Sequence, residues 1–386
     1  MNPRTLEPLN PDTSDIAGLY IHIPFCLTKC NYCNFYSVTS PLLIPDFLEA
    51  LFQEMEMTHE QWGPFDTVYI GGGTPSLLSL GQLETILTAV RRRFVLLDHS
   101  EITLETNPGD LNLPFLQGLQ GIGINRLNVG IQSFDPNILD SLGRRHSSTQ
   151  AISAIENSRG AGFQNIGLDL IYGIPGQELK SWRETLHQGL LFSPEHLSCY
   201  QLSLEEKTPL GRRHRQGEFR LPGEGLQYDF FMKTSEWLEG AGYLRYEVSN
   251  FARNLAFASR HNQKYWNHTS YLGLGPAAHS FREGERWSNH SSLNQYLADI
   301  KKGTRPIGMR ESLTIEQLQL EVLFLGLRTR RGICLQDFAE RYHVDLLSEK
   351  KDMINRLQEE RLLSIQNGYL MPTRAGLAVA DSLALM

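Results

Sequence analysis

Residues 21–37 read IHIPFCLTKCNYCNFYS, which places Cys26, Cys30 and Cys33 directly after an apolar, strand-like run. The chain of 386 residues has five cysteines, so more than half of them stand in this one stretch. Thiols spaced so closely need a chemical reason. A zinc site, a disulfide framework and an iron–sulfur cluster are the three candidates.

The spacing of the cysteines separates these candidates. Structural zinc sites take four ligands, usually as two separated pairs, and the remaining Cys199 and Cys334 are isolated. An odd number of neighbouring thiols cannot all pair as disulfides, and a chain with so few cysteines is unlike a disulfide scaffold. An iron–sulfur cluster held by three thiolates remains, and it would leave one iron free to bind a small molecule.

The pattern CxxxCxxC, with the aromatic Tyr32 just before the last cysteine, resembles the radical S-adenosylmethionine (SAM) superfamily. The resemblance implies that Cys26, Cys30 and Cys33 hold a [4Fe–4S] cluster whose open iron is chelated by the amine and carboxylate of SAM. It also implies that an electron from the cluster cleaves SAM to a 5′-deoxyadenosyl radical. A purely structural metal site is the alternative, and the spacing disfavours it.

Composition sets outer limits on the class of protein. With 41% hydrophobic and 10% aromatic residues the chain can bury a large core and form more than one domain. Residues 1–17 are polar and carry three prolines, which predicts a flexible N-terminal arm rather than a signal peptide. Without a membrane-length apolar run, and with thiols that must stay reduced, we expect a cytoplasmic protein with no integral membrane segment. A net charge of −7 argues against a nucleic-acid partner.

Short β-rich runs alternate with amphipathic stretches between about residues 18 and 204, which is typical of βα units and a parallel sheet. The predicted strands are 19–23, 67–71, 102–107, 127–132, 166–172 and 197–204. The predicted helices include 46–59, 80–93, 149–161 and 178–191. We therefore predict an α/β fold, a partial (β/α)6 barrel of the radical-SAM type, with a small C-terminal winged-helix-like α+β domain.

Polar residues share a parity within each predicted strand, although strands of parallel sheets usually read as continuous apolar runs. This alternation predicts a polar barrel interior that holds a polar ligand. The residues expected to face that interior are Thr103, Glu105, Asn107, Asn128, Gly130, Gln132, Gly167, Asp169, Cys199, Gln201 and Ser203. Leu104, Val129, Ile131, Leu168, Leu170 and Leu202 are expected to pack under the helices.

Ligands of such barrels lie at the carboxyl ends of the strands. The run GGGTPS at 71–76 follows the second strand and is similar to the glycine motif of radical SAM proteins, which implies a backbone cradle for the SAM amine; Thr74 would cap the segment after it. For Arg144 a solvent-exposed helix end is an equal alternative, and for His22 a place in the core is favoured. The predicted SAM contacts are Tyr20, Tyr32, Gly72, Gly73, Thr74, Glu105, Gln132, Arg144 and Asp169. No residue is assigned a catalytic role.

Longer stretches narrow the resemblance. GLYIHIPFC at 18–26, GGGTPS, GIQSF at 130–134, LGRRH at 142–146 and DLIYGIPGQ at 169–177 occur in the order found in the oxygen-independent coproporphyrinogen III oxidase (dehydrogenase) family. The dehydrogenase motif has one more cysteine two residues after the third ligand, where this chain has Phe35. HNQKYW at 261–266 matches the HNxxYW motif of the haem chaperone branch. The chain thus resembles that branch.

The HNQKYW segment also has a physical interpretation. His261 could ligate haem iron, the aromatic residues could stack on a porphyrin, and Lys264 could meet a propionate. A packed helix start is the alternative that the chemistry alone favours. The haem-binding candidates are His261, Asn262, Tyr265 and Trp266, with Cys199, His279 and Cys334 behind them.

We divide the chain into the arm at 1–17, the barrel at 18–210, a barrel extension at 211–309 and a C-terminal domain at 310–386. The extension should contain a helix within 212–243, an extended segment at 246–251 and a glycine-rich turn at 273–279 near the barrel mouth. In the last part, helices at 315–328 and 349–360 precede β-like runs at 362–365 and 369–371 around Asn367-Gly368, a strong hairpin signal. Ten lysines and arginines against eleven acidic residues predict an interaction or lid domain, not a DNA reader.

Two functions are compatible with these motifs. The first is a haem chaperone that carries the [4Fe–4S] cluster and an exchangeable SAM and passes haem to an unidentified acceptor protein. The alternative is an oxygen-independent coproporphyrinogen III dehydrogenase, which uses radical SAM chemistry for oxidative decarboxylation in porphyrin biosynthesis. Phe35 and HNQKYW favour the first. An electron donor and a homodimer are partners that the sequence leaves open.

Overall fold

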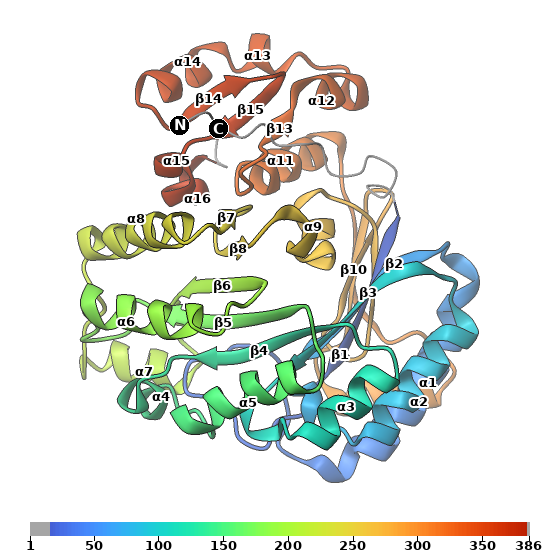
Figure 1. Ribbon diagram of the computed structural model, residues 1–386. Helices are drawn as coiled ribbons and strands as arrows, with labels where there is room; N and C mark the ends of the chain where they lie inside the picture. Colours follow the sequence, from blue (N-terminus) through green and yellow to red (C-terminus); the bar gives the residue numbers. More distant parts are fainter. Residues whose placement is uncertain (1–15, 384–386) are drawn as a thin grey trace.

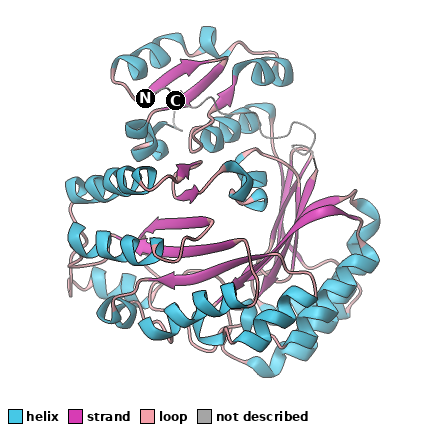
Figure 2. Cartoon of the chain, viewed as in Figure 1, coloured by secondary structure: helices cyan, strands magenta, loops and turns pink. Residues whose placement is uncertain are grey.

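The computed structural model describes residues 16–383, so the predicted N-terminal arm lies almost entirely outside the described part. A large curved sheet carries helices on its outer face, and a small unit formed by the end of the chain lies over one side of it (Figures 1 and 2). The large sheet has twelve strands in the order β12-β11-β10-β9-β1-β2-β3-β4-β5-β6-β8-β7.

Six neighbouring parallel strands, β1 to β6, form the barrel part of this sheet. Their bounds are Ala17–Ile23 (β1), Phe65–Gly72 (β2), Leu96–Thr106 (β3), Arg126–Gln132 (β4), Ile166–Tyr172 (β5) and His196–Gln201 (β6). The helices between them are α1 (Ile44–Thr58), α2 (Leu80–Arg93), α3 (Leu113–Gly121), α4 (Pro136–Ser141), α5 (Ser148–Gly160) and α6 (Leu179–Leu190). The six predicted strands and four predicted helices are confirmed, while α3 and α4 were missed.

Local sequence explains where the covering helices begin. Ser79 and Ser147 each cap a helix, α2 and α5, in a reciprocal capping box with the glutamine three residues later. The helices then bury apolar side chains against the outward residues of the strands. Leu104, Val129, Ile131, Leu168 and Leu170 belong to that core, as predicted. The basic run at 91–93 forms the last turn of α2, where cations suit the helix dipole.

The predicted faces of the sixth strand are wrong, because the predicted alternation is shifted by one residue. Asp169, which faces the interior, pairs in register with Ser198, so Ser198 shares the interior face. Cys199 instead pairs with Leu170 and packs in the hydrophobic core, only 2% exposed. The strand ends at Gln201, and the alternation read through Leu202 therefore extended past the strand.

Six further strands extend the sheet at both edges. They are β7 (Leu244–Arg245), β8 (Asn250–Ala252), β9 (Tyr271–Leu274), β10 (His279–Arg282), β11 (Glu285–Asn289) and β12 (Ile307–Ser312). The helices of this region are α7 (Pro209–Arg215), α8 (Glu224–Gly240), α9 (Arg260–Trp266) and α10 (Leu293–Lys301). Two predictions need correction. Of the predicted extended segment, residues 246–249 connect β7 to β8 and only 250 and 251 are strand residues. Part of the glycine-rich turn is β9, which pairs in parallel with β1.

The end of the chain forms a separate small core. Its elements are α11 (Ile315–Gly326), β13 (Ile333–Cys334), α12 (Leu335–Tyr342), α13 (Leu346–Glu349), α14 (Lys351–Glu359), β14 (Leu363–Gln366), β15 (Tyr369–Pro372), α15 (Arg374–Ala378) and α16 (Ala380–Leu383). The three strands form an antiparallel sheet, and the hairpin turns at Asn367 and Gly368, both with positive φ. The Asn-Gly signal correctly predicted the hairpin. Helices followed by this hairpin form the winged-helix-like arrangement that was expected.

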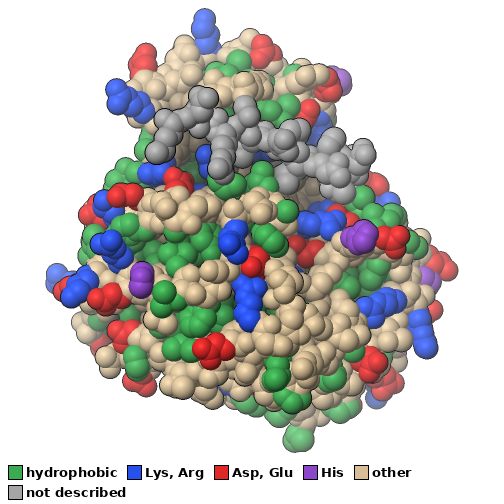
Figure 3. All heavy atoms as spheres, viewed as in Figure 1, with side chains coloured by type: hydrophobic (Ala, Val, Ile, Leu, Met, Phe, Trp, Pro, Cys, Tyr) green, Lys and Arg blue, Asp and Glu red, His purple; other side chains and the backbone are tan. Residues whose placement is uncertain are grey.

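No helix within residues 16–383 is both long enough and apolar enough to cross a membrane. On the face drawn in Figure 3, positive and negative side chains are interspersed. This mixed surface agrees with the modest net charge of the chain.

Candidate functional site

The three clustered cysteines lie on the loop that follows β1, at the carboxyl end of the barrel strands. All five cysteines are free, which removes the disulfide interpretation. Thr74 donates a hydrogen bond from Oγ1 to Cys26 Sγ at 3.4 Å, and Arg144 donates from Nη1 to Cys30 Sγ at 3.3 Å. Cys33 completes the set and is partly exposed. Thr74 was predicted as a helix cap, but its hydroxyl is used for the thiol and makes no cap bond.

The arrangement of the thiols distinguishes two kinds of metal centre. Among residues 16–383 no three His, Cys, Asp or Glu side chains meet where one metal ion could bind. A structural zinc ion would gather its sulfur ligands within about 2.3 Å of one point. In an iron–sulfur cluster each cysteine ligates a different iron, so its thiols stand apart. Three thiols on one loop, two of them with a polar side chain against the sulfur, can supply the three ligands of such a cluster.

The three glycines at the end of β2 are required by close packing. A Cβ on Gly72, whose φ is +111°, would stand 2.6 Å from the ring of His22. A Cβ on Gly73 would stand 2.6 Å from the carbonyl oxygen of Phe25, and the next amide, that of Thr74, donates to the same oxygen at 2.7 Å. The glycine loop therefore clamps the chain entering the cysteine loop. A direct contact of this loop with SAM stays a prediction.

Glu105 links the glycine loop to the barrel interior. Its carboxylate accepts hydrogen bonds from Tyr69 Oη at 2.7 Å and from the Gly72 amide at 3.0 Å. Burial raises the pKa of Glu105 to about 7, although the Tyr69 hydrogen bond acts in the opposite direction. Sequence reasoning missed Tyr69, but the alternation of 67–71 would have placed Thr67, Tyr69 and Gly71 on the interior face.

Two other predicted SAM contacts have polar atoms without partners. Asp169 accepts a hydrogen bond from Asn128 through Oδ2 at 2.6 Å, whereas its buried Oδ1 has no partner among residues 16–383. Burial raises the pKa of Asp169. Arg144 donates hydrogen bonds from Nη1 to Cys30, as above, and from Nη2 to the Gly130 carbonyl oxygen at 2.7 Å. Its Nε is buried and has no partner in the described part of the chain. Arg144 thus points into the site, and the solvent-exposed alternative is wrong.

The remaining predicted contacts lie around the same strand ends. Gln132 is 8% exposed and ends β4 with a φ of +64°, a conformation that non-glycine residues adopt rarely and that clusters at functional sites. Tyr20 Oη is within 3.0 Å of His22 Nδ1. His22 is 4% exposed, and burial lowers its pKa to about 4, so the core interpretation of His22 is confirmed. Tyr32 packs against a small apolar cluster that includes Leu142.

His261 lies inside the barrel, at the opposite end of the strands from the cysteine loop. Its Nδ1 is 2.8 Å from Thr67 Oγ1, its Nε2 is 2.9 Å from Tyr265 Oη, and its ring stacks on Tyr69. The side chain is 1% exposed, and burial lowers its pKa to about 3. The imidazole is therefore neutral and fully hydrogen-bonded. Iron ligation by His261 requires one of these two bonds to open.

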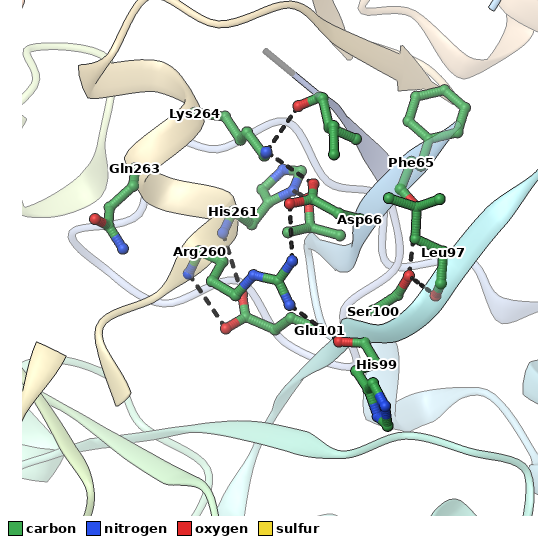
Figure 4. Close-up of polar contacts among 12 residues, drawn as sticks. Phe65, Asp66, Leu97, His99, Ser100, Glu101, Arg260, His261, Gln263 and Lys264 are labelled. Atoms are coloured by element: carbon green, nitrogen blue, oxygen red, sulfur yellow. Dashed lines mark hydrogen bonds and ion pairs between the residues drawn. The ribbon is translucent and has the colours of Figure 1, made fainter. Parts of the chain in front are cut away.

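A network of charges fixes α9 in this position (Figure 4). Asp66, 2% exposed, forms ion pairs with Lys264 at 2.7 Å and with Arg260 at 2.8 Å. Glu101 accepts from the backbone amides of Arg260 and His261 at the start of the helix. Lys264 is therefore held by Asp66, and not free for a propionate as the sequence suggested. Asn262 and Trp266, by contrast, are partly exposed.

The structure thus brings the predicted residues together in two groups. The cysteines, Thr74, Glu105, Arg144 and the neighbouring strand ends form one group, which we call the cysteine site. The residues of α9 form a second group at the start of the strands, separated from the cysteine site by the polar interior. The three other haem candidates lie elsewhere: Cys199 packs in the core, His279 begins β10 and is exposed, and Cys334 ends β13.

Two family models match the chain. Residues 20–189 match the radical SAM superfamily, and residues 313–379 match the HemN C-terminal domain. The first region contains the cysteine site and the second contains the small C-terminal core.

Curated relatives match almost the whole chain. The haem chaperone HemW of Bacillus subtilis is 35% identical over 368 residues, covering 94% of this chain and 96% of the relative. HemW of Mycobacterium tuberculosis is 33% identical and covers 98% and 97%. Radical S-adenosyl methionine domain-containing protein 1, mitochondrial, of Danio rerio is 34% identical and covers 95% and 86%.

Among solved structures, coproporphyrinogen III oxidase (HemN) from Escherichia coli superimposes with a TM-score of 0.83. The alignment covers 96% of this chain and 89% of the other, at 22% identity. At that identity the likeness establishes the fold, which is that of a radical SAM enzyme.

Proposed function

The chain belongs to the HemW family of haem chaperones within the radical SAM superfamily, and we propose on this basis that it binds haem and transfers it to an acceptor protein. The observation that carries the proposal is similarity along the full length, which includes α9 and the C-terminal core as well as the cysteine site. The acceptor is a protein that we do not identify.

We further propose that Cys26, Cys30 and Cys33 hold a [4Fe–4S] cluster with SAM on its open iron. The cluster would supply an electron to SAM. The chain's own residues would orient the two groups: Thr74 and Arg144 donate to the sulfur atoms, and the free Oδ1 of Asp169 can accept from SAM. Thiols that must stay reduced suit a reducing compartment such as the cytoplasm. An electron donor is a further expected partner.

Coproporphyrinogen III dehydrogenase activity is the second candidate, because the cysteine site suits either function. The position of the additional dehydrogenase cysteine is occupied by Phe35, whose side chain is 69% exposed and has no metal-binding atom. The dehydrogenase motif is therefore incomplete at this loop, which favours the chaperone.

The haem site is proposed on α9, at His261, Asn262, Tyr265 and Trp266. Asn262 and Trp266 present the exposed side of the helix, while His261 and Tyr265 hydrogen-bond to each other beneath it. Release of that bond would free the imidazole Nε2 for iron. Haem binding should then be accompanied by local opening of α9.

The first experiment is an anaerobic incubation of the reconstituted protein with SAM, reductant and coproporphyrinogen III. Protoporphyrinogen is assayed while a parallel sample is titrated with haem. Stoichiometric haem binding without product supports the chaperone. Product formation would identify a dehydrogenase and overturn the proposal.

Variants test the two sites separately. Cys30→Ala should abolish the cluster absorbance, whereas Cys199→Ala, a change in the apolar core, should retain it. His261→Ala should weaken haem binding by about tenfold or more if the imidazole is the axial ligand. Unchanged haem affinity would exclude His261 and direct the search to the exposed His279.

A further inference from the structure

Arg126, the first residue of β4, is a buried cation without a partner. Its side chain is 1% exposed, and it forms no hydrogen bond or ion pair with any residue between 16 and 383. Arginine keeps its proton in proteins, so the charge cannot be removed by titration. A buried charge of this kind is unfavourable unless an opposite charge or hydrogen-bond acceptors compensate it.

The interior carboxylates do not supply the missing partner. Glu105 is bound to Tyr69 and Gly72, and Asp169 is bound to Asn128. Arg126 affects the pKa of both carboxyls through space, but it makes no ion pair with either of them. The two carboxylates therefore interact with Arg126 only through space, without a hydrogen bond.

Further unpartnered atoms come from β3, on one side of β4, and from β6, which lies beyond β5 on the other side. Thr103, on β3, is in register with Arg126, and its buried Oγ1 has no partner in the described chain. His196, on β6, forms a hydrogen bond through Nε2 with Tyr246 Oη at 2.7 Å. Its buried Nδ1 has no partner in the described part of the chain. Burial lowers the pKa of His196, so the imidazole is neutral.

Gly167, on β5 between β4 and β6, allows Arg126 and His196 to lie close to the strand backbone. A Cβ at this position would stand 3.4 Å from Arg126 Nη2, 3.3 Å from His196 Nδ1 and 2.7 Å from Asn128 Oδ1. Glycine within a strand often marks a place where a ligand approaches the backbone closely.

We propose that Arg126, Thr103 and His196 form a binding site for a single carboxylate group at the base of the barrel, on the side of α9. The guanidinium fork matches a carboxylate in shape, and the hydroxyl and the imidazole can each donate a further hydrogen bond. One guanidinium neutralises one carboxylate, whereas a dianionic phosphate would add uncompensated charge near Asp169 and Glu105. A single carboxylate, that of a small acid or the end of a carboxylate side chain, matches this set of one cation and two donors.

Acetate is the probe for the test, with the full-length, cluster-reconstituted protein. Sodium acetate replaces sodium chloride at constant ionic strength, and the thermal unfolding midpoint and the calorimetric affinity are measured. A ligand that binds only the native state raises the midpoint as its concentration increases. We expect acetate to raise the midpoint, and Arg126→Met to reduce acetate affinity by about tenfold or more.

Two further variants keep the test independent of folding defects. Thr103→Val retains Arg126 but removes the unpartnered hydroxyl, and should also weaken the acetate response. Arg245→Met is the matched control, since Arg245 is equally buried at 3% exposure but lies against the rings of Phe231 and Phe251 at 4.0 and 4.8 Å. The Arg245→Met variant should bind acetate with the same affinity as the unchanged protein.

Haem and haem dimethyl ester distinguish a free acid from a haem propionate. An Arg126-dependent effect of haem that the ester lacks would identify the propionate; this comparison rests on the proposed haem function, whereas the acetate titration does not. If acetate produces no midpoint shift, or if the shift persists unchanged in both Arg126→Met and Thr103→Val, the carboxylate site is wrong. Arg126 would then serve only as a counter-charge for the interior carboxylates.

Discussion

The carboxyl of Glu105 accepts two hydrogen bonds, yet its pKa is raised to about 7 because the group is fully buried. A free glutamate has a pKa of about 4.3. The native state therefore holds a proton that the unfolded state has released between these two values. Stability decreases as the pH rises through this range, by roughly 4 kcal/mol in total.

We expect Glu105→Gln to remove this pH dependence in the protein without SAM. Because glutamine stays neutral, the variant should be more stable than the unchanged protein above pH 7 and should lose that advantage near pH 4. Urea unfolding between pH 5 and 8 measures the difference. Glu84→Gln, on the exposed side of α2, is the control and should follow the unchanged protein. Parallel profiles for Glu105→Gln and the unchanged protein would refute the raised pKa.

The cysteine site could be predicted at the residue scale because its signals are local. Cys26, Cys30 and Cys33 share one loop, and Arg144 stands in a motif with a fixed spacing. Tyr69 and Arg126 were missed because their roles depend on neighbours from other strands. No single segment reveals that Tyr69 meets Glu105, or that Arg126 lacks a partner.

At the scale of elements, strands were predictable where alternation and turn residues agreed. The strand at 166–172 was predicted with its observed bounds. The sixth strand was assigned the wrong face because Leu202 lies beyond its end, and a shift of one residue reverses a strand's faces. The short β7 escaped prediction, and the extended segment predicted at 246–251 overlaps β8 only at its end, since two or three residues carry no periodicity.

The position of α9 depends on buried charges that sequence reasoning could not assign to each other. Asp66 stands far from Arg260 and Lys264 in the sequence, yet it pairs with both in the structure. Replacing Asp66 leaves Lys264 buried without its carboxylate. Removing one member of a buried ion pair typically costs about 3–5 kcal/mol.

We therefore expect Asp66→Asn to lower the free energy of unfolding by about 3–5 kcal/mol and to increase amide exchange in α9. Urea unfolding and hydrogen exchange measure the two effects. Glu236→Gln breaks the exposed pair with Lys233 and should change neither. Unaltered exchange in α9 for Asp66→Asn would show that other contacts hold the helix.

At the scale of the whole molecule, charge separates this winged-helix-like unit from DNA-binding ones. Affinity for DNA depends on basic side chains that displace counterions from phosphates. Residues 310–386 are close to neutral, and the chain as a whole carries −7. We expect the full-length protein to show no salt-dependent retention of double-stranded DNA in a mobility-shift assay. Retention that weakens steeply with salt would contradict the assignment as an interaction or lid domain.

The small C-terminal unit is joined to the rest of the chain through α11 with the segment after it, and through α15, where Arg374 forms an ion pair with Glu239 of α8. Glu321 on α11 accepts from Arg286 at 2.6 Å and lies 3.0 Å from His268 Nε2. Backbone hydrogen bonds from Val248 to Arg328 and from Arg330 to Tyr246 add a second connection. The contacts of α11 and the segment after it hold the unit next to α9, near the proposed haem site (Figure 1).

Glu321→Gln should weaken this junction without unfolding either part. The variant loses the ion pair with Arg286, which is partly exposed, so we expect a loss of roughly 1–2 kcal/mol in the docking of the C-terminal unit. Limited proteolysis and hydrogen exchange should show faster cleavage and exchange in α11 and around Arg328, while α2 stays protected. Glu359→Gln, at the exposed end of α14 in the same unit, should leave both unchanged. If Glu321→Gln behaves like this control, the backbone bonds and the Arg374–Glu239 pair hold the unit, and haem affinity should not respond to Glu321. If α11 loosens and haem binds faster, the unit acts as a lid over α9.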